Sequence, residues 1–425
     1  MKNIHKKYDV GIGNDQETFQ NNTIFRSKSD NRSIFAALVV WIVSGSSISL
    51  IGDPHYIYIA YFAVQFLICV RSRCWFHRGS GIFVVFLIYA AWTIIASLSG
   101  MEDQFSGLVG MTMRMLIVFL PMVFLERPIK ALIDVMALIC VLDLPIYFVR
   151  QIGLLAHFDI ANLFTPIYSA IGQGDRSILI FNFHTVGEEH RNAGFFREPG
   201  MFAENLAMAS ILISVPNISM TFREKKRKAI LFFVSMLTTQ STAGLAVVPL
   251  VAIVLSPYFI KTKAVRIAVA PLLASIGAVA ILLTGFSHLD KISNQINSVS
   301  SKGSSWYNTR FGNFYVDSIA IAEKPFLGYG FSEDNRPRLF TVYNFHEGDQ
   351  LGFGNGLSGT VVKFGVVTSG FIYATFFLFC VYLFGGIFSG IVVFVALGMM
   401  LFSQQILLLP AIYTFLCFRK SSDVL

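Results

Sequence analysis

The chain has 425 residues, of which 54% are hydrophobic and only 14% are charged, and its mean hydropathy is +0.63. Soluble domains carry about a quarter charged residues, so this composition excludes an ordinary soluble protein and indicates a polytopic membrane protein. The net charge of +8 does not indicate nucleic-acid binding, because the basic residues form short clusters between apolar runs. The five cysteines lie in or beside these runs without metal-ligand spacing, so neither a disulfide framework nor a metal site is predicted.

The apolar runs predict an all-α membrane bundle. Residues 1–33 are polar and are expected to form a mostly disordered tail. The runs that follow are long enough for about 12 transmembrane helices, since about 20 residues cross the hydrocarbon core. The long run 229–260 is divided at its polar string "TTQSTAG". The predicted spans are 34–51, 55–70, 81–98, 108–125, 130–149, 200–216, 229–240, 243–260, 265–286, 357–379, 386–401 and 403–418.

The loop charges predict the orientation of these spans. Lys and Arg cluster in the N-terminal tail, "RSRCWFHR", "ERPIK", "REKKRK", "KTKAVR" and "FRK", but are absent from "IGDPH", "SGMEDQFSG" and "TTQSTAG". Cytoplasmic loops are enriched in Lys and Arg, so both termini are predicted to be cytoplasmic. The predicted order is a tail at 1–33, helices one to five at 34–149, an outward loop at 150–199, helices six to nine at 200–286, a second outward loop at 287–356, helices ten to twelve at 357–418 and a tail at 419–425.

The two outward loops are expected to carry the function, because long connections in a bundle whose other connections are short are usually functional. Within the first loop, "SILIFNF" has the composition of a strand. Within the second, 306–321 is expected to form a helix that lies on the membrane surface, because Trp306, Phe314 and Ile321 recur at near-helical spacing.

The basic residues of the first outward loop are all arginines. The planar guanidinium binds phosphate oxygens in a bidentate manner, which suits an anionic lipid head group such as a pyrophosphate. The alternative is ion pairing with Glu188, Glu189, Glu333 and Asp334. The basic residues of the two loops are Arg150, Arg176, Arg191, Arg197, Lys291, Lys302, Arg310, Lys324, Arg336 and Arg338.

The string "RNAGFFREPGMFAENL" at 191–206 joins the first loop to the sixth span. Pro199 is expected to begin the helix, because the missing N–H of proline is tolerated in the first turn. Glu198 then lies at the helix N-terminus, either as a carboxylate favoured by the helix dipole or in a functional role, as a general base or as an organiser of Arg191 and Arg197. Phe195 and Phe196 are expected at the membrane interface.

Other charged residues are also candidates. His346, next to Glu347 and Asp349, could deprotonate a sugar hydroxyl or could form structural hydrogen bonds. Charges inside spans are costly unless they are paired or face a cavity. Arg114 is therefore expected either to pair with Asp143 or to line a cavity near the outer leaflet, and Lys130 is expected to pair with Asp134 one turn later. The charged residues placed within spans are Arg114, Asp134, Asp143, Glu204 and Lys363.

Several of these strings resemble a known family. "NAGFFREPGMFA" is similar to the G-F-x-x-E-P pattern of Wzy-type oligosaccharide repeat-unit polymerases. "LTTQSTAGLAVVPL" (237–250) resembles the polar turn of a helical pair in the wider O-antigen polymerase and ligase superfamily. "TRFGNFYVDSIAIAEKPFLGYGF" (309–331) resembles its segment in which P-x-x-G-x-G follows an arginine, and "NGLSGTVVKFGVV" (355–367) agrees in position. The superfamily often has Ser-Arg where this chain has Ser241-Thr242.

The resemblance implies a metal-independent glycosyltransferase in the bacterial inner membrane that needs no cofactor. Donor and acceptor would be undecaprenyl-pyrophosphate-linked oligosaccharides on the outer leaflet, and the partners would be membrane lipids, a chain-length regulator and a flippase, without nucleic acid. The resemblance favours Glu198 and Arg310 as catalytic residues, and His346 joins them as a candidate from its side-chain chemistry alone. Arg191, Arg197 and Arg310 fall on family-like positions. The other candidates to bind pyrophosphate or sugar follow from the loop and span charges alone and are Arg176, Arg336, Arg338 and Arg114.

Two alternative functions stay open. An O-antigen ligase, which transfers glycan to lipid A-core, would carry a His-Asn-type pair at the end of the second loop, whereas His346 and Asn355 are separated here. A transporter or lipid-linked oligosaccharide flippase of the major-facilitator type would show G-x-x-x-D-[RK]-x-G-[RK]-[RK] between spans two and three. The string "VRSRCWFHRG" lacks that aspartate.

Overall fold

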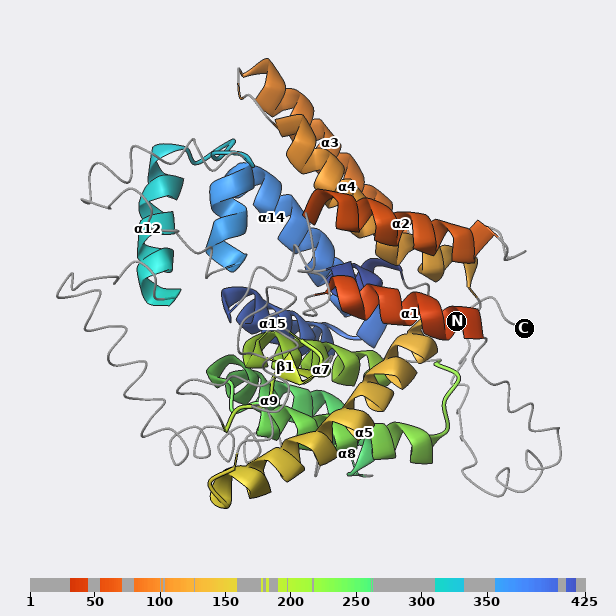
Figure 1. Cartoon of the computed structure of the whole chain (residues 1–425). Coiled ribbons are helices and arrows are strands. Elements are labelled where there is room, and N and C mark those ends of the chain that lie inside the picture. Colours follow the sequence, from red (N-terminus) through yellow and green to blue (C-terminus); the bar gives the residue numbers. More distant parts are fainter. Residues whose placement is uncertain are drawn as a thin grey trace, which may run out of the picture.

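The described part of the chain is almost entirely helical in a computed structural model (Figure 1). Within the described residues, one antiparallel pair of two-residue strands, β1 (Ser177–Ile178) and β2 (Phe181–Asn182), lies within the string predicted to form a strand. The all-α prediction is therefore confirmed. The structure describes residues 31–44, 54–70, 80–99, 101, 104–125, 127–158, 177–178, 181–182, 190–196, 198–215, 218–260, 262, 310–331, 356–403 and 410–417.

The helices other than α12 overlap the predicted apolar runs. Before the first long loop they are α1 (Asn31–Val43), α2 (Pro54–Val70), α3 (Ser80–Leu98), α4 (Gln104–Phe124) and α5 (Pro128–Leu155). After it they are α7 (Pro199–Ser214), α8 (Phe222–Thr238), α9 (Thr242–Leu255), η4 (Ser256–Tyr258), α12 (Arg310–Glu323), α14 (Gly356–Phe384), α15 (Ile387–Ser403) and η7 (Pro410–Cys417). The predicted span 265–286 lies outside the described residues.

Among the described residues, four helical stretches are long and apolar enough to cross a membrane, which gives the chain the character of a membrane protein. The total number of spans and their orientation stay predictions. The four stretches are Gly81–Leu98, Gly107–Phe124, Pro128–Leu155 and Gly356–Phe384.

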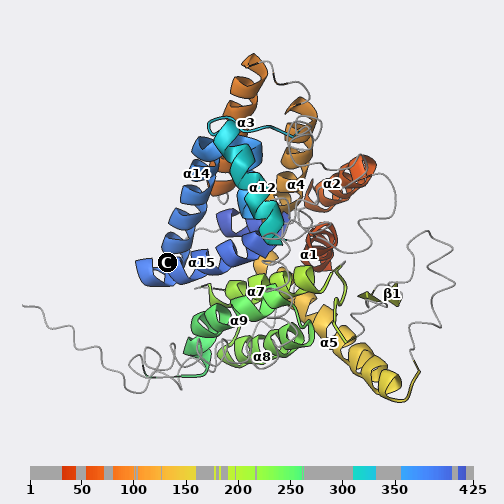
Figure 2. The ribbon, with the colours of Figure 1, turned by 90° about the vertical axis from the view of Figure 1, so that its left-hand side faces the viewer.

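Helix α7 lies at the centre of the bundle. It packs against α5, α8, α9 and α15, and Figure 2 shows it between α15 and the α8–α9 pair. Almost every side chain of α7 is buried, including the polar Glu204 and Asn205. Its small residues let neighbouring backbones approach closely. A Cβ on Gly244 of α9, for example, would stand only 2.6 Å from the Cβ of Ala203.

The turn between α8 and α9 confirms that 229–260 forms two helices. Gln240 adopts a left-handed conformation with φ of 45°, which ends α8. The Ser241 hydroxyl then accepts a hydrogen bond from the Gly244 amide at 3.4 Å and caps α9.

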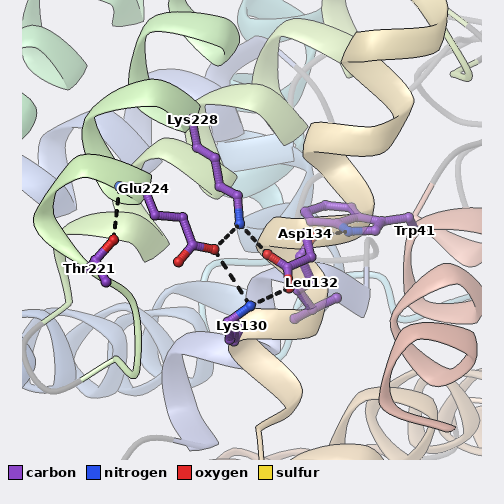
Figure 3. Close-up of polar contacts among 7 residues, drawn as sticks. All are labelled: Trp41, Lys130, Leu132, Asp134, Thr221, Glu224 and Lys228. Carbon is purple, nitrogen blue, oxygen red and sulfur yellow. Dashed lines mark hydrogen bonds and ion pairs between the residues drawn. The ribbon is translucent and has the colours of Figure 1, made fainter. Parts of the chain in front are cut away.

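Helix α5 is joined to α8 by a group of four charged side chains, here called the charged quartet: Lys130, Asp134, Glu224 and Lys228 (Figure 3). Lys130 Nζ lies 2.7 Å from Asp134 Oδ2, as the sequence predicts, and 3.5 Å from Glu224 Oε1. Lys228 contacts both carboxylates. Each charge therefore has a partner on both helices, which fixes the N-terminal end of α5 against that of α8.

Helix α12 packs against α14, as the views in Figures 1 and 2 agree. Phe314 and Tyr315 are exposed, but Asp317 is 6% exposed and accepts a hydrogen bond from Ser358 Oγ on α14 at 2.6 Å. The prediction of a helix near 306–321 is confirmed from Arg310 onward. One face of this helix is therefore covered by α14, and Ser358 supplies the hydrogen-bond donor that the buried Asp317 carboxylate needs.

Helix α14 is broken at Gly365, where φ is 74° and ψ is 168°. The segment Pro325–Gly330, which contains the P-x-x-G-x-G string, fills the break. The Tyr329 amide donates to Val362 O at 2.7 Å and the Gly330 amide to Lys363 O at 2.9 Å. The Val366 amide donates to Pro325 O at 2.7 Å. The backbone groups freed by the break thus find partners inside the protein, as a membrane bundle requires.

We predict that Gly365→Ala destabilises the protein by at least about 2 kcal/mol, because the residue has positive φ and its Cβ would meet backbone. That Cβ would stand 1.8 Å from Phe326 O. The midpoint of thermal unfolding in detergent, followed by circular dichroism, measures the effect.

Gly370→Ala is the matched control, since a Cβ at Gly370 of the same helix meets nothing within 4 Å. That variant should be as stable as the wild type or more stable by up to about 1 kcal/mol, since alanine favours helix. Equal unfolding midpoints for the two variants would contradict the proposed packing of the break.

Candidate functional site

The described residues that precede α7, 190–196 and 198, are anchored by Asn192. This side chain is fully buried, and its Nδ2 donates to Asp143 Oδ2 on α5 at 2.6 Å and to Thr238 Oγ1 on α8 at 3.0 Å. Its backbone amide donates to Thr238 O at 3.1 Å. Its Oδ1 accepts from the Gly194 amide at 2.9 Å. One asparagine therefore ties the segment to two helices and also closes its own turn.

Asp143 lies within α5 and is fully buried. The expected ion pair with Arg114 is wrong, because Asp143 accepts from Asn192 and the Arg114 guanidinium lies 4.6 Å from the centroid of the Tyr58 ring. A cation over an aromatic face is a favourable arrangement in a poorly solvated place. Charge complementarity in the sequence did not identify the partner, because an uncharged amide supplies the donor.

The C-terminal part of α5 presents a polar stripe to the same segment. Asp143, Tyr147, Arg150 and Gln151 recur at helical spacing and so share one face. Tyr147 donates its hydroxyl to His190 O at 2.8 Å, and Gln151 Oε1 lies 3.1 Å from His190 Nδ1. Arg150 is fully buried within this region. A stripe of this kind inside an apolar run places polar groups against the first long loop.

The turn is completed by Gly194 and two phenylalanines. Gly194 has φ of 54°, and a Cβ there would stand 2.5 Å from the ring of Phe202. Phe196 is fully buried and stacks on Phe202 with ring centroids 5.5 Å apart. Phe195 is 3% exposed, so the expectation that Phe195 and Phe196 lie at the membrane interface is wrong. Their rings pack into the bundle and hold the turn on α7.

Arg191 and Glu198 lie on either side of this anchored turn, and both are partly exposed. Pro199 is the first residue of α7 and Glu198 is its N-cap, as predicted. The Glu198 side chain forms no capping hydrogen bond, although its backbone is extended as an N-cap residue should be. The described geometry thus brings one cation and one carboxylate to the start of the central helix.

The other predicted site residues lie elsewhere. Arg310 begins α12, which packs on α14 away from α5 and α8 (Figures 1 and 2). Arg114 lies on α4 beside Tyr58. The remaining candidates, Arg176, Arg197, Arg336, Arg338 and His346, lie outside the described residues.

The sequence did not single out Asn192, Tyr147, Gln151 or Thr238, although all four build the site. For α5 a signal was present, because its polar residues share one helical face inside an apolar run. In the part of the chain that the structure describes, no three His, Cys, Asp or Glu side chains are grouped so that they could hold a metal ion.

Comparison with known proteins gives no family assignment. No family model matches the chain, and no curated protein is significantly similar to it. The resemblance to the polymerase and ligase superfamily therefore rests on its short motifs and their order.

We predict that Asn192→Ala destabilises the protein by about 1.5–3 kcal/mol, because Asp143 loses a hydrogen-bond donor in a buried place. Asp143→Asn should also destabilise it, since two amides then face one another with one fewer acceptor. Thermal unfolding in detergent measures both effects.

The reciprocal double variant, Asp143→Asn with Asn192→Asp, supplies the control. It keeps one amide and one carboxylate in contact and leaves an oxygen for the Gly194 amide. We expect it to be more stable than either single variant. Additive losses in the double variant would show that the two side chains are not coupled.

Proposed function

We propose that the chain is an integral-membrane glycosyltransferase that polymerises lipid-linked oligosaccharide repeat units. The carrying observation is the anchored turn at 191–198, which holds Arg191 and Glu198 at the start of the buried central helix. This turn carries the string that is similar to the Wzy-type pattern. A cation and a carboxylate on a rigid support suit a reaction that expels an anionic leaving group and removes a proton.

The proposed reaction moves the growing glycan from its lipid carrier to a new repeat unit. A hydroxyl of the acceptor sugar attacks the anomeric carbon of the donor, and a new carbon–oxygen bond forms there. The bond between that carbon and the pyrophosphate oxygen breaks, and the lipid pyrophosphate leaves with the electron pair. Arg191, with Arg197 next to Glu198, stabilises the departing phosphate oxygens. Glu198 accepts the hydroxyl proton.

The buried anchor makes this assignment physically reasonable. A catalytic group must be held within about 0.5 Å of its productive position, which a loop achieves only when other contacts lock it. Asn192, which lies between Arg191 and Glu198 in the sequence, donates two side-chain hydrogen bonds and one backbone hydrogen bond to the helices α5 and α8. The turn can therefore present both charges without the large entropy that a free loop would lose on binding.

We propose the corresponding topology for the whole chain. About 12 spans would place both termini in the cytoplasm of a bacterial cell and the loops 150–199 and 287–356 outside the inner membrane. The substrates would be undecaprenyl-pyrophosphate-linked oligosaccharides. His346 and Arg310 belong to the second loop region, where they would bind the sugar or the pyrophosphate.

A flippase is the second candidate, and the break in α14 favours it. Discontinuous helices are typical of transporters, in which unwound backbone near the middle of the membrane binds substrate. In this chain Tyr329, Gly330 and Pro325 already satisfy the groups that the break frees. A filled break leaves less backbone for a substrate than an open one, so we place the polymerase first.

We predict that a strain lacking this protein accumulates lipid A-core that bears a single repeat unit, because flipping and ligation continue while polymerisation stops. Electrophoresis of the extracted lipopolysaccharide measures the glycan ladder. Complete loss of transferred repeat units would instead identify a ligase or a flippase. Restoration of the ladder by a plasmid-borne copy is the control.

We predict that Arg191→Ala and Arg310→Ala each lower the rate of polymer formation about 10²- to 10³-fold, the loss that follows removal of one charge-stabilising donor. Arg191→Lys and Arg310→Lys are matched controls, because lysine keeps the charge but loses the bidentate fork. We expect intermediate polymer length from the lysine variants. Full-length polymer from an alanine variant at normal protein levels would remove that arginine from the proposed site.

A further inference from the structure

The first two turns of α8 are strongly basic. They carry Arg223, Lys225, Lys226, Arg227 and Lys228 but only one acidic residue, Glu224. Glu224 and Lys228 belong to the charged quartet with Lys130 and Asp134, in which two cations meet two carboxylates (Figure 3). The quartet is therefore neutral and leaves the remaining four basic side chains uncompensated.

These four side chains, Arg223, Lys225, Lys226 and Arg227, are here called the basic surface. Arg223, Lys226 and Arg227 are exposed and Lys225 is partly exposed. Among the described residues, none of the four forms an ion pair with an acidic side chain. Burial instead lowers the pKa of Lys225 from its ordinary value. A concentration of cations without counter-charges calls for an anion from outside the chain.

Two of the lysines lie over aromatic rings of the residues that follow α9. Lys225 Nζ lies 5.8 Å from the centroid of the Tyr258 ring, and Lys226 Nζ lies 5.5 Å from that of Phe259. Phe222 packs against Tyr258 with ring centroids 5.7 Å apart. Phe222 and Phe259 are nevertheless 60% and 48% exposed. Exposed phenylalanines beside Lys and Arg are typical of helices that lie at the boundary between head groups and acyl chains.

An apolar stripe continues from the basic surface along α8. Ile230, Val234 and Leu237 are 46%, 38% and 43% exposed. They follow Arg223, Lys226 and Arg227 at helical spacing, so the basic and apolar residues share one face of the helix. A nucleic acid or an acidic peptide would engage the cations and leave this stripe in water. A phospholipid would cover both parts, with its phosphate on the basic turn and its chains along the stripe.

We propose that the basic surface and its apolar stripe form a binding site for an anionic glycerophospholipid. The phosphate would accept hydrogen bonds from Arg223 and Arg227, and Lys226 would add a nearby charge. Phe222 and Phe259 border the head group. The charged quartet holds α8 against α5, so the surface is fixed before the lipid binds. This site is independent of the proposed glycosyl transfer.

Native mass spectrometry of the full-length chain in detergent tests the site. The delipidated protein is titrated with phosphatidylglycerol and with phosphatidylcholine of the same acyl chains, and we expect a preference for phosphatidylglycerol. In the variant R223Q/K226Q/R227Q the apparent Kd for phosphatidylglycerol should rise about fivefold for each charge removed. The weaker binding of phosphatidylcholine should change little.

Two controls make the result specific. The variant K2Q/K6Q/K7Q removes the same charge from the N-terminal segment and should keep the wild-type preference. Inorganic phosphate should bind far more weakly than phosphatidylglycerol, because it has no chains for the apolar stripe. The proposal is overturned if the folded R223Q/K226Q/R227Q variant keeps its phosphatidylglycerol affinity, if K2Q/K6Q/K7Q loses as much, or if inorganic phosphate binds equally well.

If the R223Q/K226Q/R227Q variant does not fold, the salt dependence of lipid binding to the wild-type protein tests the proposal. Added salt screens charges, so phosphatidylglycerol binding should weaken as the KCl concentration rises, while phosphatidylcholine binding stays constant. A phosphatidylglycerol affinity that does not respond to salt would also overturn the proposal.

Discussion

Buried polar groups in this bundle must find hydrogen-bond partners within the chain, because an apolar surrounding offers none and each unsatisfied group costs several kcal/mol. This requirement accounts for two of the interruptions in or between the described helices. At the start of α7, Asn192 donates to Asp143 Oδ2 and to the Thr238 carbonyl at the end of α8. At Gly365, Pro325–Gly330 satisfies the freed backbone of α14. In both interruptions a short non-helical segment places its polar groups between helices and forms hydrogen bonds with them.

The strings that resemble the polymerase superfamily lie at these interruptions, and several of their residues have architectural roles. Gly194 approaches Phe202, and Gly328 allows the Pro325–Gly330 segment to lie against Val362 O. A motif of this kind therefore does not identify catalytic residues by itself. It identifies where the backbone is rigid and non-helical, and the charged residues Arg191 and Glu198 lie next to one such place.

Sequence patterns predicted the helices well and their partners poorly. The features that were predicted correctly depend on local composition or on spacing along one helix. They are the apolar runs, the division at "TTQSTAG", the start of α7 at Pro199 and the Lys130–Asp134 pair. The partner of Asp143 depends on which residue of a distant loop reaches it, and hydropathy contains no such information. The break at Gly365 was also missed, because a glycine inside an apolar run reads as an ordinary helical residue until a second segment fills the gap.

Helices α5 and α8 connect the two ends of the described bundle. They are tied near their N-termini by the charged quartet and near α8's C-terminus through Asn192, which bonds to Asp143 and Thr238. Two attachment points about two and a half turns apart prevent the helices from sliding or rotating against one another. The pair is therefore a rigid frame. One end of it fixes the turn that carries Arg191 and Glu198, and the other end carries the basic surface, so both surfaces are held by the same pair of helices.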